Sequence, residues 1–230
     1  MEKHELDSYI KAGQIAKQVK SYARGIIRSG IKLIDIAEKI DAKIEELGGE
    51  PAFPVNLSLN EIAAHYTPFP GDETIAEGIL KIDIGVAVDG YIADTAFSVD
   101  LTDNGEFKKM IELNEKILKD ATKIIKPGIE VCEVGESVQD NLEKWNNENE
   151  TNFRVIKSLS GHQLGQDIIH AGLTIPNIRN SNNTELNDMA FAIEPFVTTG
   201  VGDVYEGPAG GIYSLQSDGN VRDRDAREVL

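Results

Sequence analysis

The sequence predicts an α+β protein built from two related halves. Residues 23–40 align without a gap with residues 121–138, and they share a glycine and a glutamate as well as the apolar pattern. Each copy lies in a stretch with the periodicity of paired helices, and β-like sequence follows each stretch. A helix pair followed by several strands, present twice, indicates two similar units. We expect one domain over residues 1–230, with halves at about 5–102 and 104–230.

Apolar residues at helical spacing predict a helix pair at the start of each half. In the first half we expect helices over residues 6–28 and 33–47, separated by a glycine that ends the first of them. In the second half we expect helices over 110–124 and 131–145, separated by a Pro-Gly stop. The two pairs account for the repeat seen in the alignment.

Short runs rich in β-branched and aromatic residues follow each helix pair and predict strands. After the first pair these runs cover residues 51–59 and 80–101. After the second pair they cover 153–160, 173–176 and 189–200. A catalytic site in such a protein would lie between the halves and take residues from both.

The clearest local pattern is a hairpin within residues 80–99. Asp89-Gly90 is a strong two-residue turn signal, and alternating apolar residues flank it. With these residues as the loop, Asp83 and Asp94 project from the same face, roughly 7–8 Å apart between Cα atoms. The isoleucines and valines that alternate with them form the core face.

Two carboxylates held close together among small residues repel each other and lose solvation. They persist if a cation lies between them, or if one of them stays protonated. The alternative is that both point to solvent on the outer face of the hairpin. The pattern alone leaves a metal site and a solvated face open.

Three histidines and one glutamate lie near the ends of predicted strands. Singly, His65, His162 and His170 are typical of hydrogen-bonded structural histidines, but together, beside an acidic hairpin, they indicate a site. Glu194 lies in the apolar segment FAIEPF, where burial without a partner would be costly. The repeat places it at a strand end that matches the strand end of Asp83. The alternative is a glutamate that reaches water.

The composition argues against several classes of partner. The chain has 23 Lys+Arg against 39 Asp+Glu, a net charge of −16, so we expect neither nucleic acid nor an anionic membrane as a partner. No apolar run approaches the roughly 20 residues of a membrane span, and the start shows no signal-peptide pattern. The single cysteine, Cys132, cannot form an internal disulfide. These features together favour the cytoplasm.

Four segments are similar to the type 2 methionine aminopeptidases in their archaeal form. They are PAFPVNLSLNEIAAHYTP, KIDIGVAVDGYIADTAFSV, SGHQLGQDIIHAG and AIEPFVTTG, and the similarity covers about residues 6–216. The resemblance implies the pita-bread (creatinase/aminopeptidase-like) fold with two pseudo-symmetric halves. It also implies removal of the initiator methionine from nascent proteins by two divalent metal ions (Co, Mn, Fe or Zn). The implied partners are the N-termini of nascent proteins and the ribosome.

The resemblance further assigns roles to individual residues. The implied metal ligands are Asp83, Asp94, His162 and Glu194. The implied substrate contacts are His65, His170, Phe53, Ile169 and Phe196. Glu194 is also the implied acid and base for the attacking water, and the two histidines hold or polarise the scissile amide. The three apolar residues line the methionine pocket.

The resemblance also implies a fifth ligand that this chain does not carry. The family has a second glutamate on a late strand after a helical insertion, and this chain stops at Leu230, where the insertion would begin. We therefore expect a C-terminally truncated chain with an incomplete second half, lacking the final strands and the helical insertion. We expect such a chain to be weakly active or inactive by itself.

Two other functions stay open. An aminopeptidase specific for Xaa-Pro would share the fold and the Asp-x10-Asp spacing, although the segments AAHYTP and SGHQLGQDIIHAG favour the methionine enzyme. A non-catalytic binding protein on the same scaffold would be marked by lost ligands. Here only the ligand beyond the chain end is missing.

Overall fold

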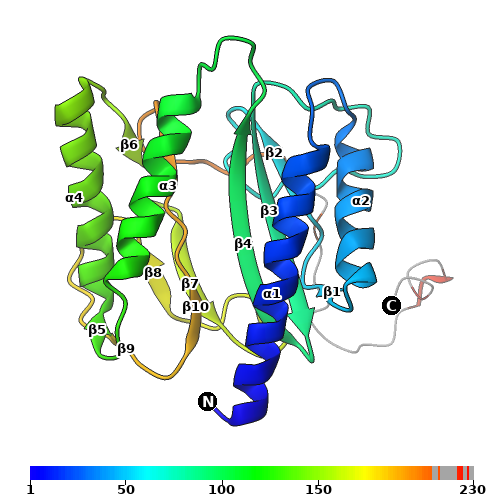
Figure 1. Ribbon diagram of the computed structural model, residues 1–230, viewed down its shortest axis with the longest axis horizontal. Helices are drawn as coiled ribbons and strands as arrows, with labels where there is room; N and C mark the ends of the chain where they lie inside the picture. Colours follow the sequence, from blue (N-terminus) through cyan, green and yellow to red (C-terminus); the bar gives the residue numbers. More distant parts are fainter. Residues whose placement is uncertain (209–211, 213–221, 225–226, 228–230) are drawn as a thin grey trace.

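The computed structural model describes residues 1–208, 212, 222–224 and 227, and it shows the mixed α+β architecture that the sequence predicts (Figure 1). The helices described are α1 (Lys3–Ile26), α2 (Leu33–Glu46), α3 (Lys108–Lys123) and α4 (Val131–Asn149). All four predicted helices are confirmed, with ends that move by up to four residues. No helix in this part of the chain is long and apolar enough to cross a membrane.

The strands form one larger sheet and several smaller ladders. Those of the larger sheet are β1 (Glu50–Pro51), β2 (Asn56–Leu59), β3 (Ile79–Val88) and β4 (Tyr91–Asp100). A three-stranded sheet contains β7 (Ser160–Leu164), β8 (Thr174–Pro176) and β10 (Ala190–Ala192). Two-residue strands pair as β5 (Ile129–Glu130) with β9 (Glu185–Leu186), and as β6 (Arg154–Val155) with β11 (Val197–Thr198).

The elements of the two predicted halves lie on opposite sides of the molecule. Figure 1 shows α1, α2 and the larger sheet on one side, and α3, α4 and the smaller ladders on the other. The two glycines of the repeat, Gly30 and Gly128, both adopt positive φ, at 85° and 81°. Two residues after each glycine the chain makes an antiparallel bridge, at Lys32 and at Glu130. The placement of the domain boundaries stays a prediction, and residues 209–211 and 213–221 at the end of the second half lie outside the described part.

The β3–β4 hairpin has the predicted register. Val88 pairs with Tyr91, and Gly85 pairs with Asp94. The turn residue Asp89 has a φ of 53° and the glycine after it a φ of 79°, as a type I′ turn requires. The predicted core face is fully buried at its isoleucines and packs against α1 and α2. Its opposite face is therefore the one that turns toward the rest of the protein.

Three predicted strands have wrong bounds. The segment predicted over residues 51–59 breaks near Pro54, because a proline has no N–H to donate to a sheet. The segment predicted over 153–160 ends at Val155, and a new strand, β7, starts at Ser160. The segment predicted over 189–200 is interrupted at 193–196, because Pro195 has no N–H to donate to a neighbouring strand. His162 consequently lies inside β7, and Glu194 lies between two strands.

Candidate metal centre

Two acidic side chains of the hairpin face the interior of the protein. Asp83 lies on β3 opposite Ala96, and Asp94 lies on β4 opposite Gly85, so both project from the face that is not the hydrophobic core. The side chain of Asp94 is 9% exposed, and Oδ1 of Asp83 is buried. The alternative that both carboxylates reach solvent is therefore wrong.

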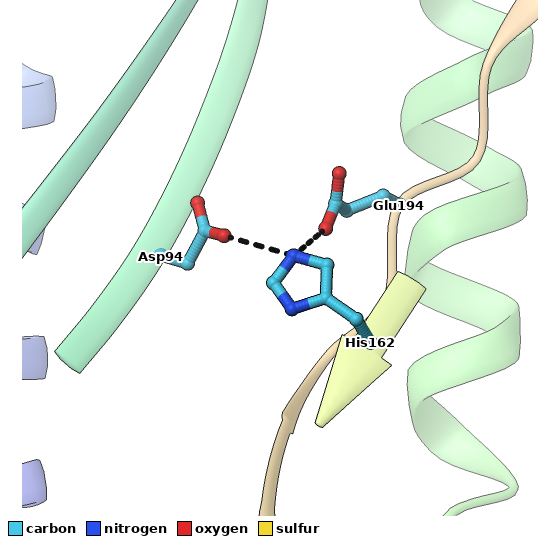
Figure 2. A group of neighbouring side chains, drawn as sticks. All are labelled: Asp94, His162 and Glu194. Atoms are coloured by element: carbon cyan, nitrogen blue, oxygen red, sulfur yellow. Dashed lines mark ion pairs between the residues drawn. The ribbon is translucent and has the colours of Figure 1, made fainter. Parts of the chain in front are cut away.

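His162 and Glu194 approach the hairpin from the smaller sheet. Nε2 of His162 lies 2.8 Å from Oε1 of Glu194 and 3.5 Å from Oδ2 of Asp94. Figure 2 shows the two carboxylates pointing at the same ring nitrogen from the strand β4 and from the segment after β10. One ligand atom from each of these three residues lies within 4.8 Å of the others. Side chains from β4, from β7 and from the segment after β10 thus converge.

A close approach of two backbones brings Glu194 to His162. In the ladder between β10 and β7, Ala192 pairs directly with His162. A Cβ atom on Gly161 would lie 2.2 Å from the carbonyl oxygen of Ala192, a distance that no other residue type could accept without a shift. The sequence did not predict that this close approach requires a glycine at position 161. The signal was the glycine placed directly before a histidine in an apolar segment.

The carboxylates of the cluster stabilise positive charge placed between them. Burial raises the pKa of Asp83 well above its usual value, and the negative charges of Asp94 and Glu194 raise it further. Burial lowers the pKa of His162, but the contacts with Asp94 and Glu194 outweigh this effect and raise the pKa to about 10. Three carboxylates around one imidazole therefore bind a proton tightly, and a cation could take its place.

The donor set fits divalent metal ions. Oδ1 of Asp83 is buried and has no hydrogen-bond partner in the described part of the chain, which is costly for a carboxylate unless a cation neutralises it. Carboxylate oxygens together with one imidazole nitrogen suit Mn, Fe, Co or Zn. The residues present therefore match the requirements of a metal centre at this position.

Two further histidines predicted for the site lie near it. The ring of His170 makes an edge contact with the ring of His162, with 4.3 Å between ring centroids. Burial lowers the pKa of His170, and the charges of His162 and of His65 lower it further. His65 is exposed and has a positive φ of 63°, which is uncommon for a histidine. The structure brings the ring of His170 against that of His162 and His65 within electrostatic range of His170.

The three apolar residues predicted for the methionine pocket lie in two places. The ring of Phe53 packs against Gly85, where a Cβ atom would come within 2.3 Å of it. Ile169 packs against a small apolar cluster that includes Ala87, which lies on β3 like Gly85. Phe196 instead lines a cavity of about 1000 Å³, bounded by β4 and α3, into which the three carboxylates also open.

Comparison with known proteins identifies the family. Residues 7–226 match the model of metallopeptidase family M24. This chain belongs to metallopeptidase family M24. Its resemblance to the archaeal aminopeptidases is confirmed by relatives described as methionine aminopeptidase. The protein of Pyrococcus horikoshii is 45% identical over 98% of this chain and 75% of its own length. That of Methanocaldococcus jannaschii is 39% identical over 100% of this chain and 76% of its own.

Solved structures confirm the pita-bread fold of this M24 chain. The methionine aminopeptidase of Thermotoga maritima matches it with a TM-score of 0.79 and 26% identity, over 92% of this chain and 87% of that one. The prolidase of Pyrococcus furiosus matches with a TM-score of 0.67 and 23% identity, over 84% and 56%, and this likeness concerns the fold alone.

Proposed function

We propose that this M24 chain is a methionine aminopeptidase that removes the initiator methionine from new proteins. The observation that carries the proposal is the convergence of Asp94, His162 and Glu194 beside the buried Asp83. Relatives that share 39–46% of their residues with this chain and bear the name methionine aminopeptidase support it. A scaffold that only binds would have no need for Asp94, His162 and Glu194 to converge beside the buried Asp83.

Two divalent ions form the proposed cofactor, with Co, Mn, Fe and Zn as candidates. Asp83, Asp94, His162 and Glu194 would hold them. When bound, such ions acidify a water molecule and polarise the carbonyl of the scissile amide. The position of the ligands at the edge of a cavity leaves room for the substrate.

The side chains of the chain supply the proton transfers. Glu194 would accept a proton from the attacking water as the C–O bond forms, and would deliver it to the amine nitrogen as the C–N bond breaks. Because its pKa is lowered, His170 is neutral at pH 7 and can donate an N–H hydrogen bond to the scissile amide without adding charge. His65 would contact the substrate from the exposed side of the site.

The substrate would be the N-terminus of a nascent protein. Phe53 and Ile169 border the metal face of the hairpin, and Phe196 borders the cavity, so apolar walls lie on more than one side of the ligands. An unbranched thioether side chain suits such walls. Action on nascent chains would place the protein in the cytoplasm and near the ribosome.

The proposal is tested with the chain itself and a Glu194→Gln variant. Metal-free protein is loaded with Mn, Fe, Co or Zn, bound metal is measured by elemental analysis, and free methionine released from a Met-Ala-Ser peptide is quantified. We expect stoichiometric metal and a weak, metal-dependent release that the variant loses. Faster cleavage of a Xaa-Pro peptide would favour the related exopeptidase, and absence of bound metal would favour a non-catalytic binding protein. The low activity expected from the sequence stays a prediction.

A further inference from the structure

A buried asparagine ties the Glu194 segment to the strand on the far side of the smaller sheet. Asn177 follows β8 directly and is 1% exposed. Its side-chain Nδ2 donates to the carbonyl oxygen of Glu194 at 2.6 Å and to that of Leu159 at 3.0 Å. Both contacts join segments that are distant in the sequence, so this amide acts as a cross-link between three parts of the backbone.

The cross-link lies where the regular sheet ends. β8 and β10 flank β7 on its two sides, and the ladders end near Ser160, at the beginning of β7. Among the residues that the structure describes, no strand pairing holds the backbone of Glu194 beyond that point, and Pro195, which follows, cannot donate a hydrogen bond. The amide of Asn177 supplies a hydrogen bond to this backbone in place of a strand pairing. It therefore fixes the main chain of Glu194, whose side chain contacts His162.

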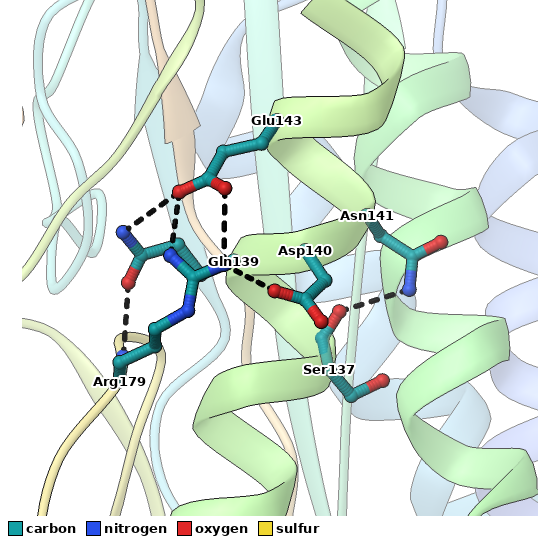
Figure 3. Close-up of polar contacts among 6 residues, drawn as sticks. All are labelled: Ser137, Gln139, Asp140, Asn141, Glu143 and Arg179. Atoms are coloured by element: carbon teal, nitrogen blue, oxygen red, sulfur yellow. Dashed lines mark hydrogen bonds and ion pairs between the residues drawn. The ribbon is translucent and has the colours of Figure 1, made fainter.

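The segment that carries Asn177 is itself fixed on α4. A Cβ atom on Gly135 would lie 2.1 Å from the carbonyl oxygen of Ile178, so this segment rests directly on the helix backbone. Figure 3 shows Arg179 held against the same helix. Its backbone N–H donates to Gln139 at 2.9 Å, and its guanidinium pairs with Glu143 at 2.6 and 3.0 Å.

Asp140 of α4 adds an ion pair with the same guanidinium (Figure 3). These pairs are exposed and contribute little stability each, but a planar guanidinium held by two carboxylates has little freedom to move. A chain of contacts therefore runs from α4 through the 176–180 segment and the amide of Asn177 to the backbone of Glu194.

We propose that Asn177 is a positioning residue for Glu194. The inference rests on the proposed role of Glu194 as a metal ligand. Without the amide, the carbonyl groups of Glu194 and Leu159 lose this hydrogen-bond donor, and the segment that carries Glu194 must move to find another. Groups that orient a metal ligand are worth about 10–100-fold in metal affinity when they are removed. Asn177 should therefore act on metal binding although it touches no ligand side chain.

The test compares Mn²⁺ binding to metal-free proteins by isothermal titration calorimetry, with folding checked by circular dichroism. Asn177→Leu removes the amide and keeps the branching and number of side-chain heavy atoms, and Asn177→Asp replaces the donor by a carboxylate of the same shape and serves if the leucine variant does not fold. The matched control is Asn146→Leu, because Asn146 also donates its amide to a backbone carbonyl, that of Phe153 at 2.8 Å, at the end of α4. If Asn177 had only a structural role, the Asn177→Leu and Asn146→Leu variants would lower the thermal stability of the protein by similar amounts.

We expect the Kd for Mn²⁺ to rise about 10–100-fold in the Asn177 variants and to stay within about twofold of the parent in Asn146→Leu. If the parent binds Mn²⁺ and Glu194→Gln loses it, while the folded Asn177 variants bind like the parent, the metal centre stands and the role of Asn177 is overturned. If the parent binds no Mn²⁺, the metal centre is wrong and the inference falls with it.

Discussion

Nε2 of His162 lies 2.8 Å from Oε1 of Glu194, across a ladder in which a glycine lets two backbones come unusually close. The same nitrogen faces Asp94 of the hairpin at 3.5 Å. A single imidazole thus faces two carboxylates, one on β4 of the larger sheet and one on the segment after β10. Whatever neutralises this charge, a proton or a metal ion, decides the chemistry of the site.

Metal affinity should rise with pH. Contacts with Asp94 and Glu194 raise the pKa of His162 to about 10 against the burial that lowers it, and burial raises the pKa of Asp83, so both groups hold protons that a metal must displace. We expect the Kd for Mn²⁺ to fall between about pH 6 and pH 8, with release of about one proton or more per chain. Calorimetry in two buffers of different ionisation enthalpy measures this release. Binding that neither depends on pH nor releases protons would contradict the assigned ligands.

The metal-free protein should lose stability as the solution becomes alkaline. The folded-state pKa of His162, about 10, lies above its usual value of 6.5, so its contribution is fully present below about pH 6.5 and is lost as the pH rises through 10. Urea unfolding of the parent and of His162→Asn at a series of pH values isolates the contribution of His162 to the free energy of unfolding. We expect the difference in unfolding free energy between the two proteins to shrink toward pH 10, whereas a constant difference would argue against the raised pKa.

Gly161→Ala should disturb the site through the backbone. The added Cβ atom would collide with the carbonyl oxygen of Ala192, and we expect a loss of about 1–3 kcal/mol of stability together with weaker Mn²⁺ binding. The control is Gly13→Ala in α1, where nothing lies within 4 Å of the added atom. That variant should be equal to or more stable than the parent, by about 0.5–1 kcal/mol. Thermal unfolding and calorimetry of both variants check the expectation, and normal metal affinity in Gly161→Ala would refute it.

His170 and His162 should respond differently to replacement, although their rings touch. His162→Ala removes the nitrogen ligand and should abolish tight Mn²⁺ binding. His170→Ala should keep the metal and lower kcat by about 10²–10³-fold, because it removes one hydrogen-bond donor to the reacting amide. Metal titrations and methionine-release rates of the two variants separate the roles. Loss of metal in His170→Ala would show that this histidine is a ligand instead.

Much of the scaffold could be predicted because its signals are local. The helices follow from apolar spacing, and the Asp89-Gly90 turn sets a register that places Asp83 and Asp94 on one face. The resemblance to a known family then named the remaining ligands, which the residues alone had left open.

The remaining features depend on contacts between distant segments. The predicted strand over 153–160 ends at Val155 and β7 starts at Ser160, so His162 lies inside β7, and the interruption around Pro195 leaves Glu194 between strands. The need for a glycine at position 161 arises from the backbone of Ala192, and the role of Asn177 arises from two carbonyls on other segments. No sequence period marks such contacts, because each depends on how two chain segments meet in space.

The most direct test of the metal centre is a crystal structure of the zinc-loaded chain with an anomalous difference map. We expect zinc at about 2.0–2.2 Å from Nε2 of His162 and from carboxylate oxygens of Asp83, Asp94 and Glu194. Zinc bound elsewhere, with His162 still paired directly to Glu194 and Oδ1 of Asp83 without a partner, would contradict it.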